Sequence, residues 1–579
     1  MTNGRLLFID AYDSFSNNII ALLHDHLPVT VTVIKIDDPR FVLNDDAILR
    51  LLNYFDAVVA GPGPGHPANA DDIGLIGKLW RLPEEQQPPV LGVCLGFQSL
   101  CLAYGANVQR LRKPRHGLIT AVTHCDRDIF DGSGDINATQ YHSLHVKLDD
   151  CNVQNALWTP SRTTQELVPL AWDLSDTQNG PILMGARHCG KPLWGVQYHP
   201  ESICTNTNGQ LLISKWWRQA CAWNTSHRRG RSEAIKTNGV VLHDGMVASS
   251  SPHNLQATAL SANPKVQWTV LVLDDAIEVI NIIEALQEPD EPILLESGTR
   301  DGRPLNRETG RFSIIGLQGD ARRSAYSLEE CEQRMQEFRA VDGPPTVPFW
   351  GGLLGYVSYE AGLKTIDVPL AAPTHQPQAW FVWAERSIVV DHVQRTVYIQ
   401  SIAASDNAWI LSTKQAISQL SIGHGRQTQN MDVYGKNSDV LSEPDKALYC
   451  RKVGDCQAHL QAGSSYELCL TDQTVVRCFT HPWTLYQKLR RANPAPFGAY
   501  LRLGTHGSPG ANVISSSPER FLSWSRSGTC QFRPIKGTVK KTPGMTRVKA
   551  EEILGSAKER AENLMIVDLI RHDLNGVAR

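Results

Sequence analysis

Short apolar runs rich in Val, Ile and Leu alternate with segments of helical periodicity through residues 1–222. The runs lie at 5–9, 31–36, 56–61 and 90–93. Strands that alternate with helices are joined by crossover connections, and they form a parallel sheet with helices on its faces. Functional residues of such sheets gather at the carboxyl ends of the strands. We therefore predict an α/β domain whose working side chains follow its strands.

One cysteine follows the strand predicted at 90–93, in the sequence Gly92-Val93-Cys94-Leu95-Gly96. Small residues on either side favour a sharp turn between strand and helix that presents the middle side chain. A helix that starts there favours the thiolate, which is the reactive form of cysteine. Cys94 is therefore a candidate nucleophile. A buried structural cysteine at a strand end fits this short pattern as well.

A histidine and a glutamate occur two residues apart in the sequence Gly195-Val196-Gln197-Tyr198-His199-Pro200-Glu201-Ser202. Side chains at positions i and i+2 of an extended segment point the same way. A cysteine nucleophile needs a base, and the base needs a group that orients it. We predict that His199 and Glu201 supply these two functions for Cys94.

A glycine- and proline-rich loop, Gly61-Pro62-Gly63-Pro64-Gly65, ends the strand predicted at 56–61. Such a loop directs backbone N–H groups toward a developing oxyanion. A plain tight turn is the alternative, because Pro and Gly clusters usually form turns. The three segments together are far more specific than any one of them.

In combination these segments resemble the triad glutamine amidotransferases, over residues 1–222. The resemblance implies that Cys94 attacks the carboxamide of glutamine, forms a glutamyl thioester and releases ammonia, with His199 as the base and Glu201 as its partner. It places the oxyanion donors at the backbones of Gly63 and Leu95. It also implies glutamine-binding positions at Gln98, Tyr141, His142, Ser143 and Leu144.

Polar stretches divide the rest of the chain. We predict a linker at 223–265 and a polar insertion at 422–445, both poor in apolar residues. The regions 266–421 and 446–579 read as one α+β domain, because their predicted strands are separated by longer helical segments.

Four segments of this second half bear on chemistry, and a helical run at 560–573 follows them. The segments are 465–471, 493–500, Ser517-Pro518-Glu519-Arg520-Phe521 and Pro534-Ile535-Lys536-Gly537-Thr538. Each alone has a plain structural explanation, such as a helix start or a surface lysine. In this order they resemble the chorismate-utilising enzymes, whose α+β fold is a two-sheet sandwich. A glutaminase placed first, together with Lys536, resembles the bifunctional aminodeoxychorismate synthases. Anthranilate synthases, which carry alanine at the lysine position, are the alternative.

The resemblance also implies roles for individual residues of this half. Lys536 would attack carbon 2 of chorismate, as a neutral amine whose pKa burial lowers. Glu519 is the candidate general base, and Glu562 is a candidate Mg²⁺ ligand. Gly537 and Thr538 would bind chorismate.

Two further expectations follow from the same comparison. Glu296, Ser297 and the segment 493–500 lie where relatives hold a tryptophan molecule, and the sequence leaves open whether this chain binds one. Chorismate-utilising domains continue beyond the position of Arg579, so we expect a truncated synthase half. The chain alone would then hydrolyse glutamine with little synthase activity, and a non-catalytic second half is the rival interpretation.

Composition narrows the classes of partner. The net charge of −3 argues against nucleic-acid binding, and no apolar run approaches the roughly 20 residues of a membrane span. Thirteen cysteines without a Cys-x-x-Cys pair are typical of reduced thiols, so we expect a cytoplasmic protein. Glutamine and chorismate are the expected small-molecule substrates, and the oligomeric state is left open.

Overall fold

The computed structural model describes residues 3–148, 157–227, 264–274, 277–286, 292–300, 303–304, 310–318, 325–366, 368–369, 379–420, 439–503 and 511–577. Most of the linker predicted at 223–265 and of the insertion predicted at 422–445 lies outside these residues. The chain forms two compact units. The first comprises Met1–His253, Glu443–Thr474 and Ile535–Arg579, and the second comprises Asn254–Ser442 and Val475–Pro534. Within the described ranges, every helix is too short or too polar to cross a lipid bilayer.

The first unit contains a nine-stranded sheet with the order β2-β1-β3-β4-β9-β8-β7-β5-β6. Neighbours from β2 to β9 pair in parallel, which confirms the predicted α/β class, and the strands beyond β9 extend the sheet in antiparallel pairs. The strands are β1 (Gly4–Asp10), β2 (Val29–Lys35), β3 (Ala57–Ala60), β4 (Val90–Val93), β5 (Asn107–His124), β6 (Ile136–Lys147), β7 (Leu167–Asp173), β8 (Ile182–His188) and β9 (Leu193–Val196).

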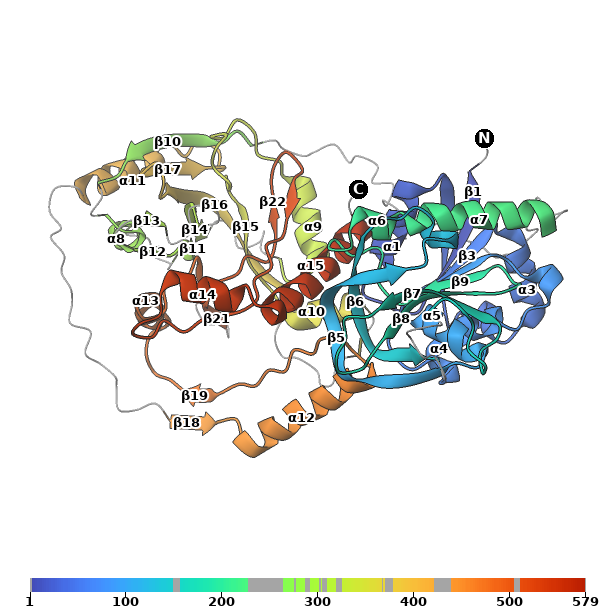
Figure 1. The fold of residues 1–579 in the computed structure, drawn as a ribbon. Coiled ribbons are helices and arrows are strands. Elements are labelled where there is room, and N and C mark those ends of the chain that lie inside the picture. Colours follow the sequence, from blue (N-terminus) through green and yellow to red (C-terminus); the bar gives the residue numbers. More distant parts are fainter. Residues whose placement is uncertain are drawn as a thin grey trace. The chain divides into compact units, whose positions relative to one another are not determined.

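Helices cover both faces of this sheet (Figure 1). They are α1 (Ser16–His26), α2 (Pro39–Val42), α3 (Asp45–Tyr54), α4 (Ala70–Leu79), α5 (Leu95–Ala103), α6 (Thr207–Gln210) and α7 (Leu212–His227), with short 3₁₀ turns at Glu84–Gln86 and Asp128–Phe130. In β1, Leu6 and Phe8 pack with α1 and α7, whereas Leu7 and Ile9 pack with α3 and α4. Burial on both faces explains why the strand reads as a continuous apolar run.

Three helices from the C-terminal half of the sequence also belong to the first unit: α12 (Lys446–Ala462), α14 (Arg547–Leu554) and α15 (Ala557–Val577). Helix α15 packs against α1 and β5, and α12 packs against β5 and β6. The compact units therefore cross the boundary predicted at residue 446, because segments that follow it in sequence pack against the sheet of the first half.

The second unit is built on an eight-stranded antiparallel sheet with the order β10-β17-β16-β14-β11-β20-β21, and β15 pairs with β16. Its strands are β10 (Gln267–Val272), β11 (Ile293–Glu296), β14 (Phe312–Gln318), β15 (Gly352–Val357), β16 (Ala379–Asp391), β17 (Thr396–Ser401), β20 (Phe497–Leu503) and β21 (Ala511–Ser517). The helices of this unit are α8 (Val279–Ala285), α9 (Leu328–Glu337), α10 (Tyr359–Thr365), α11 (Asn407–Leu420) and α13 (Pro482–Ala492).

Apolar residues of α8 and α11 pack on one face of this sheet, over Ile315, Ile388 and Ile399. The α+β class is confirmed. Of the two sheets predicted for a sandwich, the described residues form one large sheet and three two-stranded ribbons, so a second large sheet is not seen among them. The ribbons are β12 (Thr299–Arg300) with β13 (Arg303–Pro304), β18 (Asp439–Ser442) with β19 (Val475–Arg477), and β22 (Ser523–Trp524) with β23 (Cys530–Gln531).

Candidate active site

Cys94 lies at the junction of β4 and α5, where the backbone makes the predicted sharp turn. Its backbone φ angle is +49°, which residues other than glycine rarely adopt. The flanking glycines are required by close packing. A Cβ at Gly92 would lie 2.6 Å from the backbone carbon of Gly96, and a Cβ at Gly96 would lie 2.4 Å from the carbonyl oxygen of Ala60. A strained backbone at this position is typical of a functional residue.

His199 and Glu201 form a buried pair. The His199 Nδ1 atom lies 2.6 Å from Oε1 of Glu201, and both side chains are only 1% exposed. Strand β9 ends at Val196, His199 then forms an isolated antiparallel bridge with Thr139, and Pro200 and Glu201 form a turn, so the extended backbone predicted for this segment holds at His199 but not at Glu201. The contact forms nonetheless, since the turn brings both side chains to the same place.

The charge of Glu201 controls the protonation of His199. Burial alone would lower the pKa of His199, but the Glu201 carboxylate and the neighbouring Cys94 thiol raise that pKa well above its ordinary value. The Nε2 atom of His199 is buried and makes no hydrogen bond with any described residue. This nitrogen is therefore available to exchange a proton with the thiol.

Two amide side chains lead to the thiol, and of these the sequence analysis identified Gln98 but not Gln197. Gln98 donates through Nε2 to Oε1 of Gln197 over 3.1 Å, and Gln197 donates through Nε2 to Sγ of Cys94 over 3.5 Å. Gln98 also donates to the carbonyl of Leu144. Gln197 lies two residues before His199 in the same motif, which is the only sequence signal that could have indicated it.

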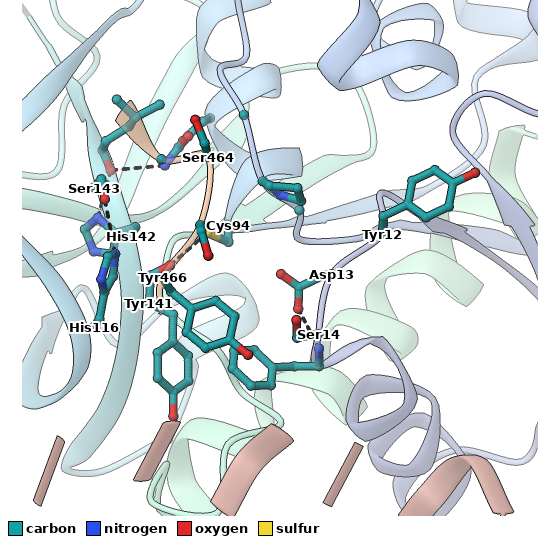
Figure 2. Close-up of a pocket in the computed structure, with 18 residues that line it drawn as sticks. Tyr12, Asp13, Ser14, Cys94, His116, Tyr141, His142, Ser143, Ser464 and Tyr466 are labelled. Atoms are coloured by element: carbon teal, nitrogen blue, oxygen red, sulfur yellow. Dashed lines mark hydrogen bonds between the residues drawn. The ribbon is translucent and has the colours of Figure 1, made fainter. Parts of the chain in front are cut away.

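A cavity of about 250 Å³ opens beside Cys94 (Figure 2). All five residues predicted to bind glutamine line it, together with Gly63 of the predicted oxyanion loop. His142 has a structural role there. Its two ring nitrogens contact the carbonyl of Leu144 and Oε1 of Gln140, and burial lowers its pKa to about 3, so it remains neutral.

The loop at 61–65 follows β3 and is held in place by close packing. A Cβ at Gly63 would lie 2.5 Å from the Cβ of Ala11, so only glycine fits. Leu95 is the first residue of α5, and its N–H belongs to the amides of a helix start that have no intrahelical acceptor. The backbone N–H groups of Gly63 and Leu95 remain the predicted oxyanion donors.

The segment that follows α12 completes the wall of this cavity. Gly463 ends the helix with φ +80°, and its carbonyl accepts a hydrogen bond of 3.0 Å from the N–H of Gly65. Three residues later the ring of Tyr466 lies 5.3 Å from that of Phe15 and 6.4 Å from that of Tyr141, beside the cavity (Figure 2). The sequence analysis singled out the segment 465–471 but did not predict its contact with this cavity, because more than 300 residues separate it from the other cavity residues.

Asp13 is a second acidic residue at the cavity. Its Oδ1 accepts a hydrogen bond of 2.8 Å from the N–H of Phe15. The pKa of Asp13 is raised to about 7: burial is the main cause, His199 opposes the shift, and the Glu201 carboxylate adds to it. The sequence analysis did not identify Asp13 as a site residue.

The predicted lysine nucleophile also lies in the first unit. Lys536 is 29% exposed, so its amine is not fully turned to solvent, and its Nζ lies 2.8 Å from Oε1 of Glu467. Gly537 has φ +82°, and a Cβ there would lie 2.5 Å from Oε2 of Glu559. Thr538 is exposed. The structure thus places Lys536 in an ion pair with a residue that the sequence analysis had not assigned.

Glu562, the candidate Mg²⁺ ligand, lies on α15. Its carboxylate is 40% exposed and lies 3.6 Å from the ammonium of Lys558. In the described part of the chain, no three His, Cys, Asp or Glu side chains gather closely enough to hold a metal ion. These residues therefore do not form a metal site by themselves.

The remaining predicted residues lie in the second unit. Glu519 follows β21 and is exposed. Glu296 is buried, and its carboxylate accepts hydrogen bonds from Tyr486 over 2.5 Å and from Arg490 over 2.6 Å. The adjacent cavity measures about 20 Å³, which is far smaller than an indole ring. Ser297 donates its hydroxyl to the carbonyl of Phe312.

Comparison with known proteins decides the family. Residues 7–218 match the class-I glutamine amidotransferases, and residues 291–579 match the chorismate-binding enzymes. Aminodeoxychorismate synthase of Saccharomyces cerevisiae is 31% identical over 98% of this chain and 79% of its own length. The chain belongs to the aminodeoxychorismate synthase family. Aminodeoxychorismate synthase of Streptomyces griseus is 32% identical over 99% of this chain and 77% of its own length.

Membership of this family accounts for the order of the two halves. Anthranilate synthase component 2 of Mycobacterium tuberculosis is 32% identical, but the match covers only 40% of this chain and 90% of that protein. The likeness to anthranilate synthase is thus confined to part of the chain, whereas the aminodeoxychorismate synthases match nearly all of it.

Proposed function

We propose that this chain transfers the amide nitrogen of glutamine to chorismate and so makes 4-amino-4-deoxychorismate. One observation carries the proposal: a buried His199–Glu201 pair lies beside Cys94, at a cavity lined by every predicted glutamine-binding residue, in a member of the aminodeoxychorismate synthase family. Glutamine and chorismate fit the two matched domains.

The geometry supports a thioester mechanism for the first reaction. His199 takes the proton of the Cys94 thiol through Nε2, while Glu201 holds the opposite nitrogen and stabilises the imidazolium. The thiolate adds to the carboxamide carbon, and the backbone amides of Gly63 and Leu95 stabilise the oxyanion. His199 returns the proton to the leaving ammonia, and water then hydrolyses the glutamyl thioester to glutamate.

Lys536 explains how nitrogen reaches carbon 4 of the ring. Ammonia that attacked carbon 2 directly, with loss of the hydroxyl from carbon 4, would place nitrogen at the position found in anthranilate. If Lys536 attacks carbon 2 first and the hydroxyl leaves, ammonia then adds at carbon 4 and displaces the lysine amine. We propose Glu519 as the base for these proton transfers and Gly537 and Thr538 as chorismate contacts.

Glu467 bears on the protonation of Lys536. A carboxylate at 2.8 Å favours the charged ammonium, whereas nucleophilic attack needs the neutral amine. We therefore propose that the ion pair describes the resting enzyme and that Lys536 leaves Glu467 before it attacks the ring.

The metal cofactor and the cellular location of this protein are also proposals. We propose Glu562 as one carboxylate ligand of Mg²⁺, with further oxygen ligands from substrate and water, and no step above depends on this ion. The twelve cysteines in the described ranges are all free thiols, which supports a reducing compartment such as the cytoplasm.

The test is the identity of the product. Chorismate and glutamine are incubated with the chain, and glutamate and the aminated ring product are separated and identified by mass spectrometry. Formation of 4-amino-4-deoxychorismate supports the proposal. Anthranilate as the product would contradict the role of Lys536, and glutamate release without any aminated product would favour a glutaminase with an inactive second half.

A further inference from the structure

Asp568 of α15 is a buried carboxylate that contacts the glutaminase site. Its side chain is 1% exposed. The carboxylate accepts hydrogen bonds from the hydroxyl of Ser202 (2.5 Å), the N–H of Ile203 (3.0 Å), the phenol of Tyr141 (2.8 Å) and the guanidinium of Arg571 (2.8 Å). A charged group is stable at this depth only when such partners satisfy it.

Two of these partners belong to the turn that carries the catalytic base. Ser202 and Ile203 directly follow Glu201, so Asp568 fixes the backbone where the turn leaves the catalytic pair. Arg571 acts at the same place, because it donates a hydrogen bond of 3.1 Å to the backbone carbonyl of Glu201. Helix α15 therefore holds the side of the turn that the sheet does not hold.

The opposite side of the turn is anchored within the amidotransferase sheet. The N–H of His199 donates to the carbonyl of Thr139 over 3.0 Å, and the hydroxyl of Thr205 donates to the carbonyl of His199 over 2.7 Å. The two anchors together restrain the backbone on both sides of the His199–Glu201 pair, and only the Asp568 anchor comes from the C-terminal half of the chain.

The third partner of Asp568 is a wall of the glutamine cavity. The Tyr141 ring packs edge-on against the His199 imidazole, with centroids 5.1 Å apart. Its backbone carbonyl lies 3.9 Å from Sγ of Cys94. The hydrogen bond from its phenol to Asp568 fixes the ring that contacts the catalytic base.

We propose that Asp568 is a positioning residue for glutamine hydrolysis: it holds the turn of His199 and Glu201 and the ring of Tyr141 in the reactive arrangement. Asp568 lies in the region matched to the chorismate-binding enzymes, so a residue of the synthase half sets the rate of the glutaminase half. The inference rests on the proposed glutaminase function and identifies a residue outside the triad on which that function depends.

The test compares Asp568→Asn with the wild-type full-length chain. Asparagine keeps the size of the side chain but removes the charge and one acceptor oxygen, so the turn loses part of its anchor. We expect kcat for glutamate release to fall between about 10- and 100-fold, because small displacements of catalytic groups have effects of this size. The KM for glutamine should change less than kcat, since the glutamine contacts remain.

A milder variant and a control keep the test independent of folding. Ser202→Ala removes a single donor, and its effect on kcat should be much smaller in the Asp568→Asn background than in the wild type, as expected when two residues act through one contact. The control is Asp573→Asn, the same chemical change at an exposed position of the same helix, which should retain wild-type kcat.

Three outcomes are decisive. A selective loss of kcat in Asp568→Asn, with non-additive Ser202→Ala, supports the inference. Wild-type kcat in Asp568→Asn, or independent effects of the two substitutions, would overturn it. A wild-type chain that releases no glutamate would instead contradict the proposed glutaminase function itself.

Discussion

Replacing Glu201 with glutamine tests the electrostatics of the catalytic pair. The substitution keeps the shape of the side chain and removes its charge. In the native chain the 2.6 Å contact between Nδ1 of His199 and the carboxylate is fully buried, so solvent does not screen it. A hydrogen bond to a charged group contributes about 1.5–3 kcal/mol, and if this stabilisation is needed in the transition state its loss lowers kcat roughly 10- to 150-fold.

The same variant should also alter the reactivity of the Cys94 thiol. Burial lowers the pKa of His199 and the Glu201 charge raises it, so removing the charge leaves only the Cys94 thiol to oppose the effect of burial. The pKa of His199 then falls, and less imidazolium is present near neutral pH to stabilise the Cys94 thiolate. Alkylation of Cys94 by iodoacetamide should therefore become slower in Glu201→Gln between pH 6 and 8, a window of about one unit on either side of neutrality.

The control uses another histidine–carboxylate pair of the same unit. His188 Nε2 lies 3.3 Å from Oε1 of Glu166, whose side chain is 62% exposed, and Glu166→Gln should leave both measurements near wild type. The assay is glutamate release at saturating glutamine, with alkylation followed by mass spectrometry. Equal kcat values for Glu201→Gln and the wild type would refute the reasoning.

Three further variants address the rest of the site. Gly65→Ala should lower the free energy of unfolding by about 1–3 kcal/mol in urea titrations and should slow glutamate release. Residue 65 has φ +99°, and a Cβ there would lie 2.4 Å from the Asp72 side chain. Unchanged values of both would show that the loop adapts to the added methyl group. In the folded protein Asp13 keeps its proton up to about pH 7, whereas in the unfolded chain its pKa is 3.8. The free energy of unfolding of the wild type should therefore decline as the pH rises from 3.8 to about 7. The urea midpoint of Asp13→Asn should lack that decline. If the midpoints of the variant and the wild type instead changed with pH in parallel, the raised pKa would be contradicted. Lys536→Ala should release glutamate at the wild-type rate but yield no 4-amino-4-deoxychorismate by chromatography, and wild-type yield would exclude the lysine step.

The sequence predicted the local parts of the site well. The strand at 90–93 and the turn at Cys94 were predictable because β-branched runs and flanking glycines are local signals with direct structural consequences. The pairing of His199 with Glu201 was predicted correctly, although the chain turns after His199 and does not stay extended to Glu201.

Contacts between distant segments were not predictable in this way. The hydrogen bond from Ser202 to Asp568 joins residues 366 apart in sequence, and the Lys536–Glu467 ion pair joins residues 69 apart. In neither pair are the two residues adjacent or periodically spaced, so no local pattern indicates that their side chains meet. The domain boundary predicted at residue 446 differs from the compact units for the same reason, because contiguous ranges do not describe a chain that returns to its first sheet.

The most direct measurement of the central claim is the mass of the chain after incubation with chorismate in the absence of glutamine and ammonium. Without a nitrogen source nothing displaces the lysine, so the account predicts an added mass equal to chorismate minus water, located on Lys536 by peptide mapping. An unmodified Lys536, in a preparation that aminates chorismate once glutamine is added, would contradict the account.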